Sequence, residues 1–104
     1  MTNEKYILTD KIHKLKVVDL FTWGRWLETA GEKRRVGDDT VNGVRVSTVF
    51  LGLDHNWGKG KPLVFETMIF GGERDGEIER YATWKEAERS HKEVVDSLQD
   101  TKSD

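Results

Sequence analysis

The side chains best suited to chemistry gather in one short segment, residues 54–62, which reads DHNWGKGKP. It combines a carboxylate, an imidazole, an amide, an indole and two ammonium groups, carried by Asp54, His55, Asn56, Trp57, Lys59 and Lys61. A phosphorylated base could use all of these groups, because an indole stacks on a base while lysines and free glycine amides hold phosphate. We therefore predict a ligand-binding site here. The alternative is an ordinary long hairpin loop whose Trp folds back on a sheet.

Glu66 is a second candidate, because it interrupts the mostly apolar run of residues 63–70, LVFETMIF. An unpaired buried carboxylate is costly and shifts its own pKa instead. Arg80 on the next predicted strand is its natural partner, and Arg45 is the second choice. Glu66 and Arg80 would form either a structural ion pair or a ligand-reading pair on a sheet face, and we include both in the predicted ligand site.

Signals for catalysis are weak. The three histidines, His13, His55 and His91, are dispersed and lack metal-ligand spacing. Neither Ser47 nor Ser90 has a nucleophile-elbow context, and no phosphate loop or dinucleotide fingerprint is present. There is no cysteine, which excludes disulfides, zinc-thiolate sites and a thiol nucleophile. We expect a non-enzymatic protein without a cofactor, a metal ligand or a catalytic residue.

The elements that must position these residues are mostly strands. Short β-branched and aromatic runs bounded by turn residues predict strands at residues 6–9, 13–18, 33–41, 44–53, 63–70 and 77–83. Asn42–Gly43 is the strongest hairpin signal, because both residues tolerate the positive φ that a type I′ turn requires. The loop of residues 54–62 then joins the two strands of a central hairpin.

Two amphipathic helices complete the pattern. In the first, Asp19 is the expected N-cap and Gly31 the expected end. Its apolar face comprises Leu20, Phe21, Trp23, Trp26, Leu27 and Ala30. Gly24 in its middle costs about 1 kcal/mol relative to Ala, so either this helix is short or something packs closely there.

The second helix is expected to begin at a capping box, Thr83-Trp84-Lys85-Glu86. Its apolar face comprises Trp84, Ala87, His91, Val94, Val95 and Leu98. We expect both helices to cover the same face of the sheet, with their Trp residues in the core. The other face would remain partly open as a platform or dimer surface.

The fold class predicted is therefore α+β: an antiparallel sheet of about four to six strands, built from sequential hairpins and covered by two helices. The chain has 104 residues, which suits one domain at residues 1–99 and a disordered tail at 100–104. Only 36% of residues are hydrophobic while 35% are charged, so the core is thin. Four Trp, four Phe and two Tyr compensate for the scarcity of aliphatic side chains.

Charge and hydropathy limit the partners. The formal charge is −2 and the signs are interspersed, which argues against duplex nucleic acid because phosphate neutralisation needs a coherent basic face. No apolar run is long enough to cross a bilayer, and the N-terminus lacks the apolar core of a signal peptide. We expect a cytoplasmic protein with no membrane partner.

Three segments carry a resemblance to a known group of proteins: VDLFTWGRWLETA, VRVSTVFLGLDHNWGKGKPLVFETMIFGG and ERYATWKEAERSHKEVV. They are similar to a family of small uncharacterised proteins encoded by bacteriophages and prophages, and the similarity runs over residues 6–95. The family brings no assigned reaction. What the resemblance implies is a context, namely an accessory protein made in the cytoplasm of an infected bacterium.

Two functions fit that context. The first is an anti-defence protein, expected to be a homo-oligomer, that sequesters a small ligand such as a nucleotide signal of host immunity. The alternative is an inhibitor that binds a host defence protein directly, through the open sheet face or the loop that holds Trp57. A minor virion or assembly protein is less favoured.

Overall fold

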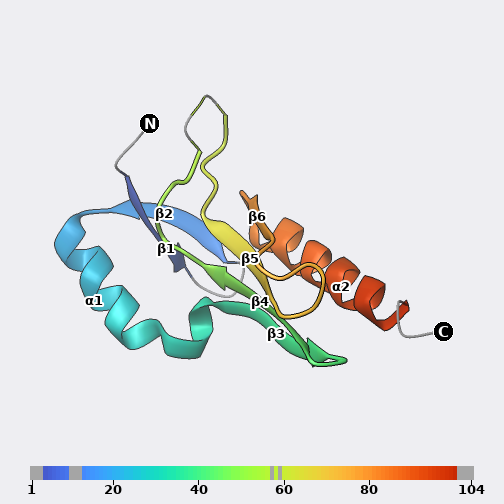
Figure 1. Cartoon of the computed structure of the whole chain (residues 1–104). Helices are drawn as coiled ribbons and strands as arrows, with labels where there is room; N and C mark the ends of the chain where they lie inside the picture. Colours follow the sequence, from blue (N-terminus) through green and yellow to red (C-terminus); the bar gives the residue numbers. More distant parts are fainter. Residues whose placement is uncertain (1–3, 10–12, 57, 59, 101–104) are drawn as a thin grey trace.

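The computed structural model describes residues 4–9, 13–56, 58 and 60–100, and it has an α+β fold (Figure 1). Its strands are β1 (Lys5–Thr9), β2 (Lys14–Val18), β3 (Arg35–Val41), β4 (Val44–Phe50), β5 (Phe65–Phe70) and β6 (Ile78–Tyr81). Its helices are α1 (Leu20–Ala30) and α2 (Trp84–Asp100), and a short 3₁₀ turn, η1 (Gly31–Arg34), follows α1. The predicted fold class is confirmed. Residues 101–104 of the expected tail lie outside the described residues.

The strands form two antiparallel sheets, with orders β1-β2 and β3-β4-β5-β6. Every strand thus pairs with its neighbour in sequence, as sequential hairpins require. The smaller sheet is linked to the larger one where the amide of Tyr6 donates to the carbonyl of Gly52 at 2.8 Å. None of the helices in the described part of the chain is long and apolar enough to span a membrane.

The β3-β4 turn confirms the local signal in the sequence. Asn42 and Gly43 have φ values of 52° and 81°, the left-handed conformation that these two residue types tolerate. They connect Val41 directly to its partner Val44. The register of the larger sheet therefore begins at a turn that the local sequence specifies.

Helix α2 covers one face of the four-stranded sheet and contacts all four of its strands. On this face, alternate residues of β4 and β5 are buried, in keeping with the two-residue period of a strand. They are Val46, Thr48 and Phe50 on β4, and Phe65, Thr67 and Ile69 on β5. The sheet face toward α2 is therefore the main core surface.

A line of contacts between aromatic rings runs through this core. Trp26 of α1 meets Phe50 edge to face at 5.6 Å between ring centroids, and Phe50 lies 5.2 Å from Phe65. Phe65 in turn meets Trp84 of α2 edge to face at 6.1 Å. The expectation that Trp residues of both helices enter one core is therefore met by Trp26 and Trp84.

The expected position of α1 and its apolar face need correction. Helix α1 packs mainly against β1, at the other end of the molecule from α2 (Figure 1), and does not lie beside α2 on the larger sheet. Leu20 and Phe21 were expected in the core but are 65% and 75% exposed. The reason is that Trp26 faces Phe50, which turns the first turn of the helix outward.

The predicted N-cap and the predicted end of α1 are both confirmed. The Asp19 carboxylate accepts the amide of Thr22 at 2.8 Å, and this bond holds the pKa of Asp19 below its ordinary value. Gly31, with φ of 50°, ends the helix in the left-handed region. Apart from the adjoining residues and backbone of α1 itself, no atom of the described residues lies within 4 Å of where a Cβ of Gly24 would be, so none of the other described elements packs closely there.

The other face of the larger sheet remains partly open, as expected. Phe70 of β5 and Ile78 of β6 are 42% and 46% exposed on it. Met68 pairs with Ile78 and with Ser47, and it lies half-buried between them. This surface, which we call the open face, is apolar in its centre and has charged residues around it.

Gly37 on β3 is expected to be intolerant of any side chain. An added Cβ would lie 2.6 Å from the His91 ring, which is buried and hydrogen-bonded on both nitrogens. Gly37→Ala should therefore lower the free energy of unfolding by about 1–3 kcal/mol, as overpacking does. Urea unfolding at low protein concentration measures this.

Gly24→Ala is the matched control. It adds the same methyl group in open space within a helix, so it should raise the free energy of unfolding by up to about 1 kcal/mol. Equal effects of the two substitutions would contradict the packing of Gly37 against His91.

Candidate functional site

The predicted loop projects from the sheet between β4 and β5 (Figure 1), and its base is held by Asp54. One carboxylate oxygen of Asp54 accepts the amides of Asn56 at 2.7 Å and Leu63 at 3.0 Å. The amide of His55 donates to the carbonyl of Leu63 at 3.0 Å, which continues the pairing across the loop. Asp54 therefore acts as a brace between the two sides of the loop.

The next two side chains of the loop also bind its backbone. Asn56 donates to the carbonyl of Lys61 at 2.9 Å and accepts the amide of Gly58 at 2.9 Å. His55 Nδ1 lies 3.1 Å from the carbonyl of Leu53, which can only accept, so Nδ1 carries the proton. These hydrogen bonds hold the described part of the loop in place without a ligand.

Of the remaining predicted site residues, Glu66 and Arg80 lie outside the loop, on β5 and β6. Lys61 is exposed, while Trp57 and Lys59 lie outside the described residues. Glu66 and Arg80 lie on the open face and form an ion pair at 3.1 Å, as the pairing of their strands predicts. The predicted partner of Glu66 is thus confirmed.

The structure contains a hollow, lined by residues that are far apart in sequence, that the sequence analysis did not predict. It lies between the β1-β2 hairpin and the first turn of α2, and its volume is about 760 Å³. We call it the hairpin pocket. Its lining residues are His13, Lys14, Leu15, Ala82, Thr83, Trp84, Lys85 and Glu88. The sequence analysis had assigned Trp84 to the core and had noted His13 only as one of three dispersed histidines.

An aromatic stack forms one wall of the hairpin pocket. The His13 and Trp84 rings lie 3.7 Å apart with only 4° between their planes. His13 has φ of 54°, which is an unusual backbone conformation for a residue other than glycine. Phe65 holds Trp84 from the core side. The stack is therefore fixed on two elements that are far apart in sequence.

The charges around the hairpin pocket are mixed but mostly positive. Lys14 and Lys85 are exposed and supply two ammonium groups, while Glu88 supplies one carboxylate. Flat aromatic rings beside cationic groups suit a planar ligand that carries negative charge.

Three backbone amides near the start of α2 are already occupied. Glu86 accepts the amides of Ala82 and Thr83 at 3.2 Å and 3.1 Å, and the Thr83 hydroxyl accepts the amide of Glu86 at 3.1 Å. The predicted capping box is therefore confirmed. Lys14 and Lys85 can hold an anion in the hairpin pocket through their ammonium groups.

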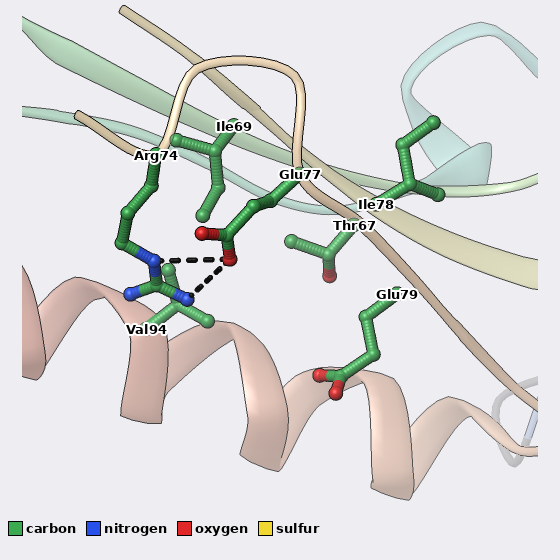
Figure 2. A pocket seen from close by; sticks show the side chains of 7 residues that line it. All are labelled: Thr67, Ile69, Arg74, Glu77, Ile78, Glu79 and Val94. Carbon is green, nitrogen blue, oxygen red and sulfur yellow. Dashed lines mark hydrogen bonds and ion pairs between the residues drawn. The ribbon is translucent and has the colours of Figure 1, made fainter. Parts of the chain in front are cut away.

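A smaller hollow lies where the β5-β6 turn meets α2 (Figure 2). Its volume is about 80 Å³, which has room for a few water molecules but not for a nucleotide. Arg74 closes it by bonding Glu77 at 3.0 Å and the Ser97 hydroxyl at 3.2 Å. It joins the turn to the helix and offers no site for an organic ligand.

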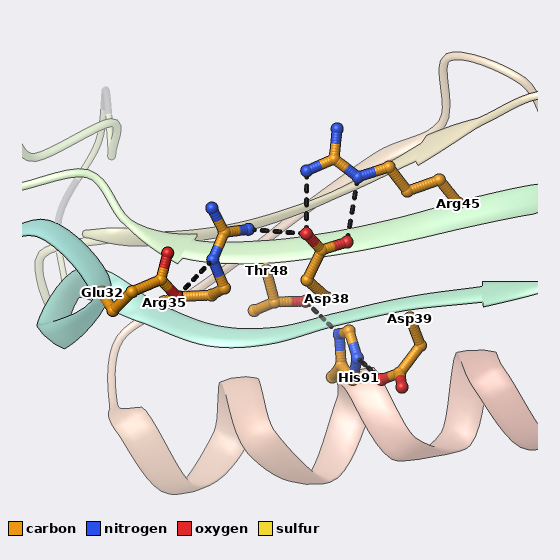
Figure 3. A network of polar contacts seen from close by, with 7 residues as sticks. All are labelled: Glu32, Arg35, Asp38, Asp39, Arg45, Thr48 and His91. Carbon is orange, nitrogen blue, oxygen red and sulfur yellow. Dashed lines mark hydrogen bonds and ion pairs between the residues drawn. The ribbon is translucent and has the colours of Figure 1, made fainter.

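Asp39, His91 and Thr48 form a hydrogen-bonded series between sheet and helix (Figure 3). His91 Nε2 lies 2.7 Å from the Asp39 carboxylate, and His91 Nδ1 lies 2.7 Å from the Thr48 hydroxyl. The order acid, imidazole, hydroxyl is that of a catalytic triad. However, Thr48 is 0% exposed and also bonds Thr67 at 2.6 Å, so no substrate can reach its oxygen in this arrangement.

Arginines flank Asp38 on both sides (Figure 3). Its carboxylate accepts from Arg45 at 2.9 Å and from Arg35 at 2.9 Å, and Arg35 also bonds Glu32 at 3.0 Å. The hydrogen bonds from Arg45 lower the pKa of Asp38 and raise that of Arg45. This network fixes the edge of the sheet near the open face.

No protein-family model, curated protein or solved structure matches this chain. Nor does the described part of the chain contain a group of three or more His, Asp or Glu side chains that could hold a metal ion.

Asp54→Ala should loosen the loop without unfolding the sheet. The substitution removes the acceptor of two backbone amides, so local opening should become easier by about 1–3 kcal/mol. Hydrogen exchange measured by NMR at the amides of Asn56 and Leu63 should accelerate accordingly. Lys61→Ala is the control and should leave these exchange rates unchanged. Unchanged exchange in Asp54→Ala would contradict the role of Asp54 in holding the two sides of the loop together.

Asp38 should make stability depend on pH in the acid range. Because its folded-state pKa is lowered, its contribution is complete above the ordinary aspartate pKa of about 3.9 and is lost as pH falls through the folded-state value. The protein and Asp38→Asn should therefore differ by a constant free energy of unfolding above about pH 5 and converge at lower pH. Urea titrations at several pH values measure the difference, and a gap that persists in strong acid would contradict it.

Proposed function

We propose that this protein sequesters a small, planar, anionic ligand such as a nucleotide, and that the hairpin pocket binds it. The observation that carries the proposal is the His13–Trp84 stack, flanked by Lys14 and Lys85 in a hollow of about 760 Å³. Hollows of roughly 300–1,000 Å³ are typical of small-molecule sites. The residues of the pocket support a role in binding.

The chemistry of the pocket matches the parts of a nucleotide. A base that extends or replaces one member of the stack gains about 1–3 kcal/mol. The lysines act as point charges for phosphate, and the Glu88 carboxylate can accept from an exocyclic amine. Binding and release would involve no bond making or breaking, so the proposed role is sequestration and not catalysis.

The phage resemblance provides the biological context of the proposal. In an infected bacterium, a protein of this kind would lower the free concentration of a nucleotide immune signal, which makes it an anti-defence protein. We assign the ligand to the hairpin pocket in preference to the loop, because Asp54 and Asn56 already bind the loop backbone. A second contact between the ligand and the loop of residues 54–62 remains a prediction.

Lys14→Ala and Lys85→Ala should each weaken ligand binding about tenfold, which is the effect of losing one hydrogen bond to a charged group. The ligand is first identified by native mass spectrometry of the gently purified protein. A panel of linear and cyclic nucleotides is then titrated with tryptophan fluorescence as the signal. Trp84 should report directly, because it is part of the stack.

The matched controls are Lys16→Ala and Lys92→Ala, which remove exposed lysines from the same strand and the same helix outside the pocket lining. They should retain affinity. Equal loss in all four variants would show only a general effect of charge. Binding that depends on Lys61 and not on Lys14 or Lys85 would move the site to the loop.

The alternative is direct inhibition of a host defence protein. The observation that favours it is the open face, where Phe70 and Ile78 are exposed beside the Glu66–Arg80 pair. Apolar centres with polar rims are typical of protein interfaces. Under this alternative, one host protein would co-purify in constant ratio, no small molecule would be retained, and Ile78→Glu would abolish the capture.

A further inference from the structure

The outer side of α1 has apolar residues that the fold leaves uncovered. Phe21 and Leu20 are the two most exposed large apolar side chains among the described residues, at 75% and 65%. They lie in the first turn of a helix at the margin of the molecule (Figure 1). Adjacent exposed apolar side chains of this size are typical of a surface that is covered by another molecule.

Gly24 lies on the same side of α1, one turn after Leu20 and Phe21. Its φ is not positive, and among the described residues beyond the adjoining part of α1, no atom lies within 4 Å of where its Cβ would be. The isolated fold therefore gains nothing from glycine here, although glycine costs a helix about 1 kcal/mol. What glycine does provide is a flat strip of backbone that a second helix can approach closely.

A shallow hollow adjoins this strip. Its volume is about 360 Å³, and its lining residues are Phe21, Thr22, Arg25, Trp26 and Thr29. One helix thus presents an exposed side chain, Phe21, and a recess that Phe21 and Trp26 both line. Phe21 is thus both an exposed side chain and the lining residue nearest the start of the helix.

The charges on this side of α1 have both signs. Arg25 and Glu28 are exposed and lie one turn apart, and neither has an ion pair within the described residues. In an antiparallel pair of α1 helices, each Arg25 would come within a turn of Glu28 of the other copy. The same arrangement turns Phe21 of each copy toward the recess beside Arg25 and Trp26 of the other.

From this self-complementary set, we infer that the outer side of α1 is a homodimer interface, formed by two antiparallel α1 helices about a two-fold axis. A two-fold interface requires a patch that contains both members of every contact. This patch contains a projection and a recess, and a positive and a negative charge. The inference is independent of the ligand proposal, because α1 contributes no residue to the hairpin pocket.

The test uses sedimentation velocity of the full chain over a range of concentrations. The protein should form dimers, and Phe21→Glu should weaken association at least tenfold while leaving the circular dichroism spectrum unchanged, because Phe21 is exposed. The matched control is Phe70→Glu, which adds the same charge at an exposed Phe on the open face. It should leave the dimer intact.

Charge reversal tests the antiparallel arrangement without removing an apolar side chain. Arg25→Glu or Glu28→Arg alone should weaken the dimer several-fold, and the double variant should restore it because each pair is re-formed across the axis. A protein that is monomeric up to millimolar concentration would overturn the inference. So would a dimer that survives Phe21→Glu and is lost in Phe70→Glu, or a double variant that is no better than the single ones.

Discussion

The fold depends on one line of aromatic contacts that joins elements from both ends of the sequence. Trp26 meets Phe50, Phe50 meets Phe65, and Phe65 meets Trp84, which ties α1 to the central strands and these to α2. A chain with only 36% hydrophobic residues needs such large side chains to exclude water from a thin core. His13 extends the line by one ring beyond Trp84, and that last contact forms the wall of the hairpin pocket.

A buried polar series complements the aromatic line near the middle of α2. The hydroxyl groups of Thr48 and Thr67 are buried, and a buried hydroxyl without a hydrogen-bond partner would destabilise the fold. The two hydroxyls bond one another, and Thr48 also bonds His91. His91 in turn reaches Asp39 at the margin of the sheet, where water is available. Because hydrogen bonds are directional, this series fixes how α2 lies along the strands more narrowly than apolar packing would. The bare backbone of Gly37 leaves the space that the imidazole fills.

Local features of the chain could be predicted from the sequence, since each depends on groups a few residues apart. The Asn42–Gly43 turn follows from conformational preference, and the box of Thr83 and Glu86 follows from amides at a helix start that need acceptors. The Glu66–Arg80 pair could also be predicted, because adjacent antiparallel strands bring their residues together in register. The α+β class follows from the two-residue and 3.6-residue periods of the apolar pattern.

The candidate sites could not be predicted in this way, because they depend on how distant elements pack. Whether Phe21 faces the core or water is set by the rotation of α1, which the contact of Trp26 with the sheet decides. The loop shows the same limit: its composition indicated a ligand site, but only the folded backbone shows that Asp54 bonds the amide of Leu63. The sequence by itself therefore determined the elements, their turns and their caps, where short-range hydrogen bonds and periodicity suffice. Only the tertiary structure decided which polar and apolar groups meet, since that depends on long-range packing and on the direction in which each element presents its side chains.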